Sequence, residues 1–460
     1  MPILGMDRIL RMWFLCGMAK TFREWDLHQN LLFPPSILDL VPEGHLAHFV
    51  RDTVVEDLDL SAILDTYTEE RGYPPYHPVM MTAVLLYAYC QGIYSSRRMA
   101  KACQERVDFM AVTAMQKPDF RTISDFRKRH LESLKGLFVQ VLRLCRKANL
   151  VSLGHVALDG TKIRANASKH KAMSYSRMKK AEPELAAIVK GWLEKAEAID
   201  AQEDEEFGPD RRGDELPDWV ADKQKRLEKI REAKAALEAE AREEAKKRKK
   251  GKGDEPSRPK RGRPPKNPPG VPKDKAQRNF TDSDSRIMKS HDGFVQAYNA
   301  QAAVDADHQV IVAQTLTNNA NDAQQLVPLV AQIKENTGRQ AEELSADAGY
   351  CSEENLKELS RRRIRGYVAT GRQKHGTASA TGSRKTQRGT RVDAMRRKLQ
   401  RGGHRSRYRL RKHVVEPVFG QIKQPRGFRQ FLLRGIEKVT GEWSLVCTAH
   451  NLLKLAKAVG

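Results

Sequence analysis

Cysteine is scarce in this sequence and follows no recognisable pattern. Six cysteines are scattered over 460 residues, with no CxxC pair and no histidine–cysteine pair at the spacing of a zinc site. The usual zinc modules are therefore excluded, and the thiols are predicted to be reduced, as in an intracellular protein. We expect all six cysteines to act as small buried hydrophobic side chains.

Long hydrophobic runs are also missing. No apolar run reaches the roughly 20 residues that a membrane-spanning helix needs, because the run over residues 12–18 is short and is flanked by basic residues. We expect residues 1–17 to be an extension, with Met18 the more natural first residue, and a signal peptide is disfavoured. The resulting expectation is a cytoplasmic protein without a membrane partner.

Acidic residues are too few to balance the basic ones. The chain has 82 Lys and Arg against 58 Asp and Glu, which gives a formal net charge of +24. The segment Arg361–Lys412 holds 19 basic residues and one acidic residue, and Lys246–Arg278 holds 14 and three. Such tracts predict a polyanionic partner. The hydrophobic content of 40% nevertheless supports packed cores in two or three domains.

The first third of the chain is predicted to be helical. An apolar helix is expected over Val79–Tyr94 and a second helix over Ser96–Gln104. A loop is expected over 118–125, in which Ser124 caps a basic helix Phe126–Asn149. Short basic helices are typical of a DNA-binding module, and an ordinary bundle with a solvated basic face is the alternative. The basic side chains that suggest DNA contact are Arg97, Arg98, Lys101, Arg127, Lys128 and Arg129.

Residues 171–280 have the composition of an insertion. Lys223–Lys247 predicts a solvated helix or a helical hairpin, whereas Lys246–Lys275 is rich in Lys, Arg, Pro and Gly and is not expected to form a packed core. Within this stretch Arg261 and Arg263 flank a glycine in a sequence that looks like an AT-hook, which places arginines along the minor groove of A·T-rich DNA. A passive basic linker is the alternative.

After the insertion the pattern changes to strands alternating with helices. Two strands are expected to be joined by a turn at 305–308, and a helix is expected to start at Asn321-Asp322. Ser352 is expected to cap a helix over Glu353–Arg361. The expected strands are His155–Asp159, Phe294–Val304, Val310–Leu316, Leu344–Asp347 and Gly366–Ala369.

Three carboxylates stand at positions that suit metal chemistry. Asp159 and Asp347 each end a strand, and Glu416 lies on a late helix that also carries Lys412 and Lys423 on the same face. Carboxylates from separate elements can bind two Mg²⁺ or Mn²⁺ ions about 4 Å apart. With the two lysines holding flanking phosphates, the set predicts phosphoryl transfer on a polynucleotide. Taken singly, each carboxylate could instead serve a turn or a cap, and the lysines could lie on a solvated helix face.

The sequences around these carboxylates resemble those of bacterial insertion-sequence DDE transposases, of the insertion-sequence family eleven-eighty-two type. The resemblance is carried by three blocks in the same order, ALDGTK at 157–162, ADAGY at 346–350 and VEPVFGQIK at 415–423. It covers roughly residues 18–170 and 281–457. The resemblance implies that Asp159, Asp347 and Glu416 are the catalytic and metal-binding residues.

The resemblance also implies a domain organisation. The expected fold class is α/β, an RNase H-like mixed sheet with flanking helices, plus an N-terminal all-α domain and a helical or disordered insertion. We expect an extension at 1–17, a DNA-binding domain at 18–150, a catalytic domain from 151–170 and 281–460, and the insertion at 171–280. The implied activity is metal-dependent cleavage and strand transfer of an insertion sequence. The implied partners are double-stranded DNA, as terminal inverted repeats and target, and further copies of the chain.

One spacing departs from that of related transposases. They often show Tyr, two residues, Arg, three residues, Glu, six residues and Lys. Here four residues separate Arg411 from Glu416, and Lys412 occupies the position expected for the arginine. The spacing weakens any role for Arg411, which stays only among the predicted DNA contacts, and it leaves Glu416 intact.

Two other functions are consistent with the same residues. One is a decayed, transposase-derived protein that binds DNA without cutting it, and the other is an RNase H-like nuclease that hydrolyses strands without joining them. The complete set of three carboxylates argues against decay. The remaining acidic candidates, Asp282, Asp284, Asp305 and Asp307, are expected to serve turns or caps.

Overall fold

The computed structural model describes residues 36–68, 74–207, 218–250, 267–290, 293–372, 379–382 and 387–459. Three predictions therefore lie outside the described residues. These are the extension at 1–17, the AT-hook-like motif with Arg261 and Arg263, and most of the stretch Lys246–Lys275.

The chain before the sheet is helical, as predicted. The apolar run yields α4, which is buried on nearly every side, and Gly92 follows it with a φ of +72°. A Cβ at Gly92 would lie 2.7 Å from the carbonyl oxygen of Arg426, so the turn after α4 needs glycine. The elements of this region are α2 (Leu46–Asp52), η1 (Thr53–Asp57), α3 (Ser61–Leu64), α4 (Pro78–Cys90), α5 (Ser96–Glu105), α6 (Val107–Thr113), α7 (Phe120–Arg129) and α8 (Leu131–Lys147).

The predicted loop at 118–125 and the cap at Ser124 are wrong. Helix α7 already begins at Phe120, because the Asp119 carboxylate accepts hydrogen bonds from the backbone N–H groups of Arg121 and Thr122, at 2.5 and 3.1 Å. The predicted single helix to Asn149 is also interrupted. It breaks at His130, which is buried and whose ring contacts the Tyr67 hydroxyl at 3.2 Å.

The sheet is mixed, in the order β4-β5-β1-β7-β8, with β6 paired to β5 as well. Strand β1 is antiparallel to β5 and parallel to β7, and β7 is parallel to β8. Strand β4 was not predicted; it pairs with the first residues of the long β5, whereas β6 pairs with the later ones. The strands are β1 (His155–Arg164), β4 (Arg286–Ser290), β5 (Gly293–Asp305), β6 (Ile311–Thr317), β7 (Glu343–Ala346) and β8 (Arg365–Val368).

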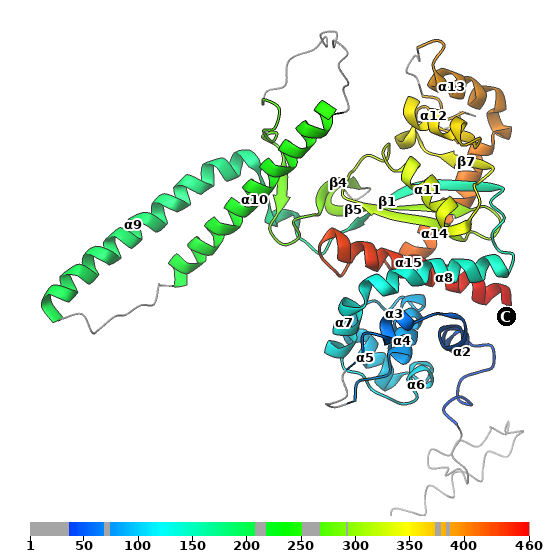
Figure 1. Ribbon diagram of the computed structural model, residues 1–460, viewed down its shortest axis with the longest axis horizontal. Coiled ribbons are helices and arrows are strands. Elements are labelled where there is room, and N and C mark those ends of the chain that lie inside the picture. The colour runs from blue at the N-terminus through cyan, green and yellow to red at the C-terminus, as the bar shows by residue number, and fades with distance from the viewer. Residues whose placement is uncertain are drawn as a thin grey trace, which may run out of the picture.

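Helices flank this sheet, so the fold is a mixed α/β arrangement (Figure 1). The prediction for Glu353–Arg361 is confirmed, including the cap, since the Ser352 hydroxyl accepts a hydrogen bond from the N–H of Asn355. The helix expected from Asn321 begins only at Leu326. These elements are α11 (Leu326–Thr337), η3 (Ala348–Tyr350), α12 (Glu353–Arg361), α13 (Arg391–Gly402), η4 (Gly403–Arg405), η5 (Arg407–Leu410), α14 (Arg411–Lys423) and α15 (Ile436–Val459).

Helices α8 and α15 join the N-terminal helices to the sheet. They lie side by side between the two regions (Figure 1), and α15 also packs against β6 and α4. Trp443 of α15 is fully buried, and its indole N–H donates to the backbone oxygen of Gln301 in β5 at 3.2 Å. One hydrophobic cluster runs through both regions. The expected boundary near residue 150 therefore crosses a continuous core.

The insertion contains a helical hairpin that projects away from the rest of the chain (Figure 1). Helices α9 (Tyr175–Phe207) and α10 (Asp218–Lys250) pack through a small cluster that includes Met178, Ile230 and Leu237. A short ladder of β2 (Ala172–Ser174) and β3 (Gln277–Asn279), next to η2 (Lys169–Lys171), closes its base. Ile230 and Leu237 of the segment Lys223–Lys247 face this partner helix, so the segment forms one arm of a helical hairpin, one of the two forms expected for it.

Two expectations from composition can be compared with the described residues. Among the helices of the described residues, none is long and apolar enough to cross a membrane. Of their cysteines, Cys90, Cys103, Cys145 and Cys447 are buried, and Cys351 is partly buried.

Candidate active site

Asp159 and Asp347 lie next to each other because of the register of two parallel strands. Leu158 of β1 pairs with Ala346 of β7, and each aspartate directly follows one member of that pair. The prediction that Asp159 ends its strand is wrong, because β1 continues to Arg164 and Asp159 pairs with Ala302 of β5. Asp159 instead lies just past the last β1–β7 pair, beside Asp347. Helix α14 packs against β1 and contributes Glu416. The fold thus brings the three predicted residues to one region.

Arg411 connects two of these carboxylates. Its Nη1 donates to Oδ2 of Asp159 at 2.7 Å, and its Nη2 donates to Oε1 of Glu416 at 2.9 Å. The arginine and aspartate side chains are only 14% and 16% exposed, whereas that of Glu416 is 44% exposed. The altered spacing does not keep Arg411 away from these carboxylates, because this residue starts α14 and its side chain reaches both groups.

The carboxylates are held in an environment that disfavours negative charge. Burial raises the pKa of Asp159 to about 6; Arg411 opposes this shift, and the charges of Asp347 and Glu416 add to it. Burial also raises the pKa of Asp347, against the hydrogen bond from the Gly349 N–H and the charge of Arg411. The site therefore favours a compensating cation.

The donor set suits a divalent cation such as Mg²⁺ or Mn²⁺. In the part of the chain that the structure describes, no three Asp, Glu, His or Cys side chains lie close enough to hold a metal ion as they stand. The Arg411 guanidinium takes the place of a cation between Asp159 and Glu416. Carboxylate oxygens are the ligands that hard divalent ions prefer. The residues fit such an ion once Arg411 moves out of the gap between the carboxylates.

The predicted DNA contacts have different surroundings. Lys423 turns its ammonium group to the Thr161 hydroxyl and to the backbone oxygen of Lys162, so it lies against β1 beside the carboxylates. Lys412 and Arg129 are exposed. All three positions are compatible with a phosphate contact.

Arg127 is not placed to bind DNA, and that prediction is wrong. The residue is 5% exposed, and its Nη1 donates to the backbone oxygen of Tyr94 at 3.0 Å and to the Tyr89 hydroxyl at 3.3 Å. The buried carboxylate of Glu442 is its counter-charge. Arg127 thus belongs to the core between the N-terminal helices and α15.

The acidic residues that we expected in turns and caps do serve there. Asp282 accepts hydrogen bonds from the Tyr298 hydroxyl at 2.8 Å and from the N–H of Gly435 at 3.2 Å. Asp284 accepts one from the N–H of Ile436, and Asp305 accepts one from the N–H of Leu153. These groups stabilise the chain where loops meet.

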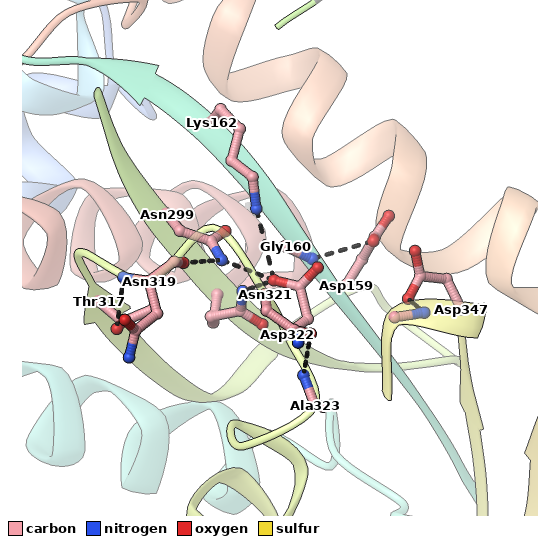
Figure 2. Close-up of polar contacts among 12 residues, drawn as sticks. Asp159, Gly160, Lys162, Asn299, Thr317, Asn319, Asn321, Asp322, Ala323 and Asp347 are labelled. Atoms are coloured by element: carbon pink, nitrogen blue, oxygen red, sulfur yellow. Dashed lines mark hydrogen bonds and ion pairs between the residues drawn. The ribbon is translucent and has the colours of Figure 1, made fainter. Parts of the chain in front are cut away.

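Asp322 was not predicted to belong to the site. Figure 2 shows its carboxylate near Asp347, with Lys162 and Asn299 pointing toward it. Its Oδ1 accepts from Asn299 Nδ2 at 2.6 Å, from Gln301 Nε2 at 2.7 Å and from Lys162 Nζ at 3.5 Å. The sequence signal that could have pointed to Asp322 is a pair of amide side chains, Asn299 and Gln301, among the small residues of β5. Both are fully buried.

Gly160 makes this arrangement possible. It pairs with Gln301 across the β1–β5 ladder. A Cβ at this position would lie 2.3 Å from Nε2 of Gln301 and 3.0 Å from Oδ1 of Asn299. A side chain at this position would displace the two amides that donate to Asp322. Close packing against these amides therefore explains why the residue after Asp159 is glycine.

Two models of known protein families match this chain. The first, Transposase domain (DUF772), matches residues 35–129, and the second, Transposase DDE domain, matches residues 269–452. Together they indicate a transposase. The DDE domain supports an enzyme that acts on DNA, and its match contains Asp347 and Glu416, whereas Asp159 precedes it. Comparisons with curated proteins and with solved structures found no match.

Proposed function

We propose that this chain is a DNA transposase that cleaves and joins DNA strands at Asp159, Asp347 and Glu416. The observation that carries the proposal is the convergence of these residues from β1, the end of β7 and α14, with Arg411 linking the first to the last. The strand order, antiparallel at β6-β5-β1 and parallel at β1-β7-β8, supports an RNase H-like catalytic domain. The motif blocks favour the insertion-sequence family eleven-eighty-two type.

A bound divalent ion would activate the attacking oxygen and neutralise charge at phosphorus. Asp159, Asp347 and Glu416 would hold such ions, which we expect to be two Mg²⁺ or Mn²⁺. Burial of Asp159 and Asp347 keeps bulk water from screening the charges. The attacking group can be water, which cuts a strand, or a freed 3′ hydroxyl, which joins it to a target. One arrangement of carboxylates therefore serves both steps.

Basic residues around the carboxylates would position the DNA. Lys423 beside Thr161 and Lys412 on the exposed side of α14 can bind phosphates on either side of the scissile one. Arg411 has a further buried N–H, Nε, with no hydrogen-bond partner in the described chain. This group can turn to a phosphate oxygen when the guanidinium leaves Asp159. Arg411 therefore remains a proposed DNA contact.

The proposed partner is double-stranded DNA, as terminal inverted repeats and as target. The sequence over 361–412 is strongly basic, and its last two residues, Arg411 and Lys412, lie on the same helix as Glu416. Arg129 supplies positive charge on the N-terminal helices. Arg261 and Arg263 are proposed to contact the minor groove of A·T-rich DNA. Further copies of the chain would complete a synaptic complex.

A nuclease that cuts without joining is the second candidate, and a decayed DNA-binding protein is the third. A strand-transfer assay separates them. The full chain is incubated with Mg²⁺, a supercoiled target and DNA that carries the inverted repeats flanking its gene. Covalent joining of the repeat ends to the target supports a transposase. Nicking alone would support the nuclease, and DNA binding without either product would support decay.

A further inference from the structure

Asp322 lies where several parts of the catalytic region meet. Lys162 of β1 contacts it from one side, and the amide of Asn299 contacts it from β5 (Figure 2). The amide of Gln301, also in β5, donates to the same oxygen. The turn after β7, at Gly349, lies on its other side. Its side chain is 16% exposed. A carboxylate in this position is neither a surface group nor a helix cap, because α11 begins four residues later.

The orientation of this carboxylate is fixed by the two amides. Nδ2 of Asn299 also donates to the backbone oxygen of Asn319 at 3.0 Å, and Oε1 of Gln301 accepts from the Tyr350 hydroxyl. Each amide therefore has only one way to face Asp322, with its N–H groups directed at Oδ1. None of the described residues donates a hydrogen bond to the second oxygen, Oδ2.

The second oxygen faces Asp347. A Cβ at Gly349 would lie 3.0 Å from Oδ2 of Asp322 and 3.0 Å from Oδ1 of Asp347. The two oxygens are therefore separated by no more than twice that distance. Two carboxylate oxygens at this spacing can share one divalent cation, either as ligands or through one of its bound waters.

The charges around Asp322 leave room for such a cation. Asp159, Asp347, Glu416 and Asp322 carry four negative charges when ionised. Arg411, Lys162 and Lys423 supply three positive charges. The cluster thus has one negative charge in excess, and two once Arg411 leaves Asp159 and Glu416, which is the charge of one divalent ion.

A buried oxygen without a partner points to the same place. Oδ1 of Asn299 has no hydrogen-bond partner in the described chain, and Asn299 is fully buried. This oxygen lies above Gly160, 3.0 Å from the position of a Cβ there, next to Asp159. Leaving a buried acceptor without a hydrogen-bond partner is unfavourable. A hydrated cation between Asp159 and Asp347 would provide a donor.

We propose that Asp322 is a fourth acidic residue of the catalytic site, which helps Asp347 to hold a divalent cation through Oδ2. Asn299 and Gln301 keep Oδ1 occupied and thereby direct Oδ2 to the ion. The inference rests on the proposed function, since it assigns a further residue to the metal site of that reaction. Two glycines keep this arrangement open: Gly160 leaves space for the two amides, and Gly349 leaves space beside Oδ2 of Asp322.

The test is Mn²⁺ binding to the full-length chain without DNA, followed by the electron paramagnetic resonance signal of free Mn²⁺. We expect Asp322→Asn to weaken binding of one ion about tenfold or more, by analogy with the loss of supporting metal contacts. Asp282→Asn is the matched control, because this buried aspartate also accepts hydrogen bonds but lies in a loop junction. It should bind Mn²⁺ as the wild type does.

A second variant tests the geometry where Asp322→Asn fails to fold. Gly349→Ala places a methyl group 3.0 Å from both carboxylate oxygens, and it should also weaken Mn²⁺ binding about tenfold. Wild-type Mn²⁺ affinity in folded Asp322→Asn, or in Gly349→Ala, would overturn the proposal. Asp347→Asn distinguishes an error in the role of Asp322 from an error in the proposed catalytic site. If it loses the ion and Asp322→Asn does not, only the role of Asp322 is wrong; if neither loses it, the proposed catalytic site itself is wrong.

Discussion

Arg411 and Asp159, which lie 252 positions apart in the sequence, form an ion pair of 2.7 Å. The other arm of the same guanidinium holds Glu416. One side chain thus gathers carboxylates from a central strand and a late helix, at the place where we propose that a divalent ion binds. Arginine and metal are therefore alternative counter-charges for the same two groups.

Replacing Arg411 by methionine should destabilise the metal-free protein and increase its response to metal. We expect a loss of about 2–4 kcal/mol in the free energy of unfolding, because Asp159 keeps a largely buried charge without its partner. Mn²⁺ should then stabilise the variant more than the wild type, since no ion pair has to break first. Urea unfolding with and without Mn²⁺ measures both effects. Lys412→Met is the control, because this residue is adjacent in sequence and exposed. If Mn²⁺ stabilised Arg411→Met no more than it stabilises the wild type, arginine and metal would not be alternative counter-charges.

Gly160→Ala should be strongly destabilising, although it adds only one methyl group. The new Cβ would meet the Gln301 amide at 2.3 Å, so a buried hydrogen-bonded network has to shift, at a cost of about 1–3 kcal/mol. Gly136→Ala in α8 is the matched control, since nothing lies within 4 Å of its Cβ. That change should stabilise the protein by about 0.5–1 kcal/mol. Thermal unfolding of both variants checks the pair, and similar melting temperatures would count against the packing argument.

Arg127→Ala and Arg129→Ala should affect different properties, although the residues are two positions apart. Arg127 is buried beside Tyr94 and Glu442, so its loss should lower the free energy of unfolding by about 3–5 kcal/mol. Arg129 is exposed, so its loss should leave stability unchanged within about 0.5 kcal/mol. It should reduce the slope of log K against log salt for DNA binding by about 0.9. An unchanged slope in Arg129→Ala would remove α7 from the proposed DNA interface.

Local patterns were enough to predict the elements that bear the carboxylates. A serine followed by two glutamates indicated the start of α12, and an aspartate after an apolar run marked the end of β7 but not of β1, which continues past Asp159 to Arg164. Asp159 and Asp347 could be predicted to lie close together because each follows an apolar run in a strand of one sheet. The hydrogen-bonding register that makes them neighbours is a property of the assembled sheet.

Contacts between distant segments could not be predicted in the same way. Arg127 looked like one of several basic residues on a helix, and only the approach of Glu442 and Tyr94 shows that it is buried. Arg411 seemed displaced by its spacing, because a spacing rule ignores the reach of a long side chain from the first residue of a helix. The contacts of Asp322 come from two amides of β5, Asn299 and Gln301. Their position beside Gly160 follows from the pairing of β5 with β1, which the sequence does not show.

The pair of His450 and Arg426 predicts a pH dependence of stability. His450 is fully buried; burial, with the neighbouring charge of Arg426, lowers its pKa to about 3. An unfolded histidine titrates near 6.5, so below that pH the unfolded state binds more protons and stability falls until about pH 3. This residue alone should lower the free energy of unfolding by about 2 kcal/mol between pH 7 and pH 5. Urea unfolding at both pH values should show a smaller loss for His450→Asn, and no change in the loss for the exposed His308→Asn.

We propose that Asp159, Asp347 and Glu416 perform metal-dependent strand cleavage, whereas basic residues provide the affinity for DNA. The most direct measurement compares cleavage and binding of DNA that carries the terminal repeats, in Mg²⁺, for the wild type and for Asp159→Asn, Asp347→Asn and Glu416→Gln. We expect each variant to lose cleavage by at least about 100-fold and to bind the DNA within a few-fold of the wild type. Cleavage at the wild-type rate in any one of the three would contradict it.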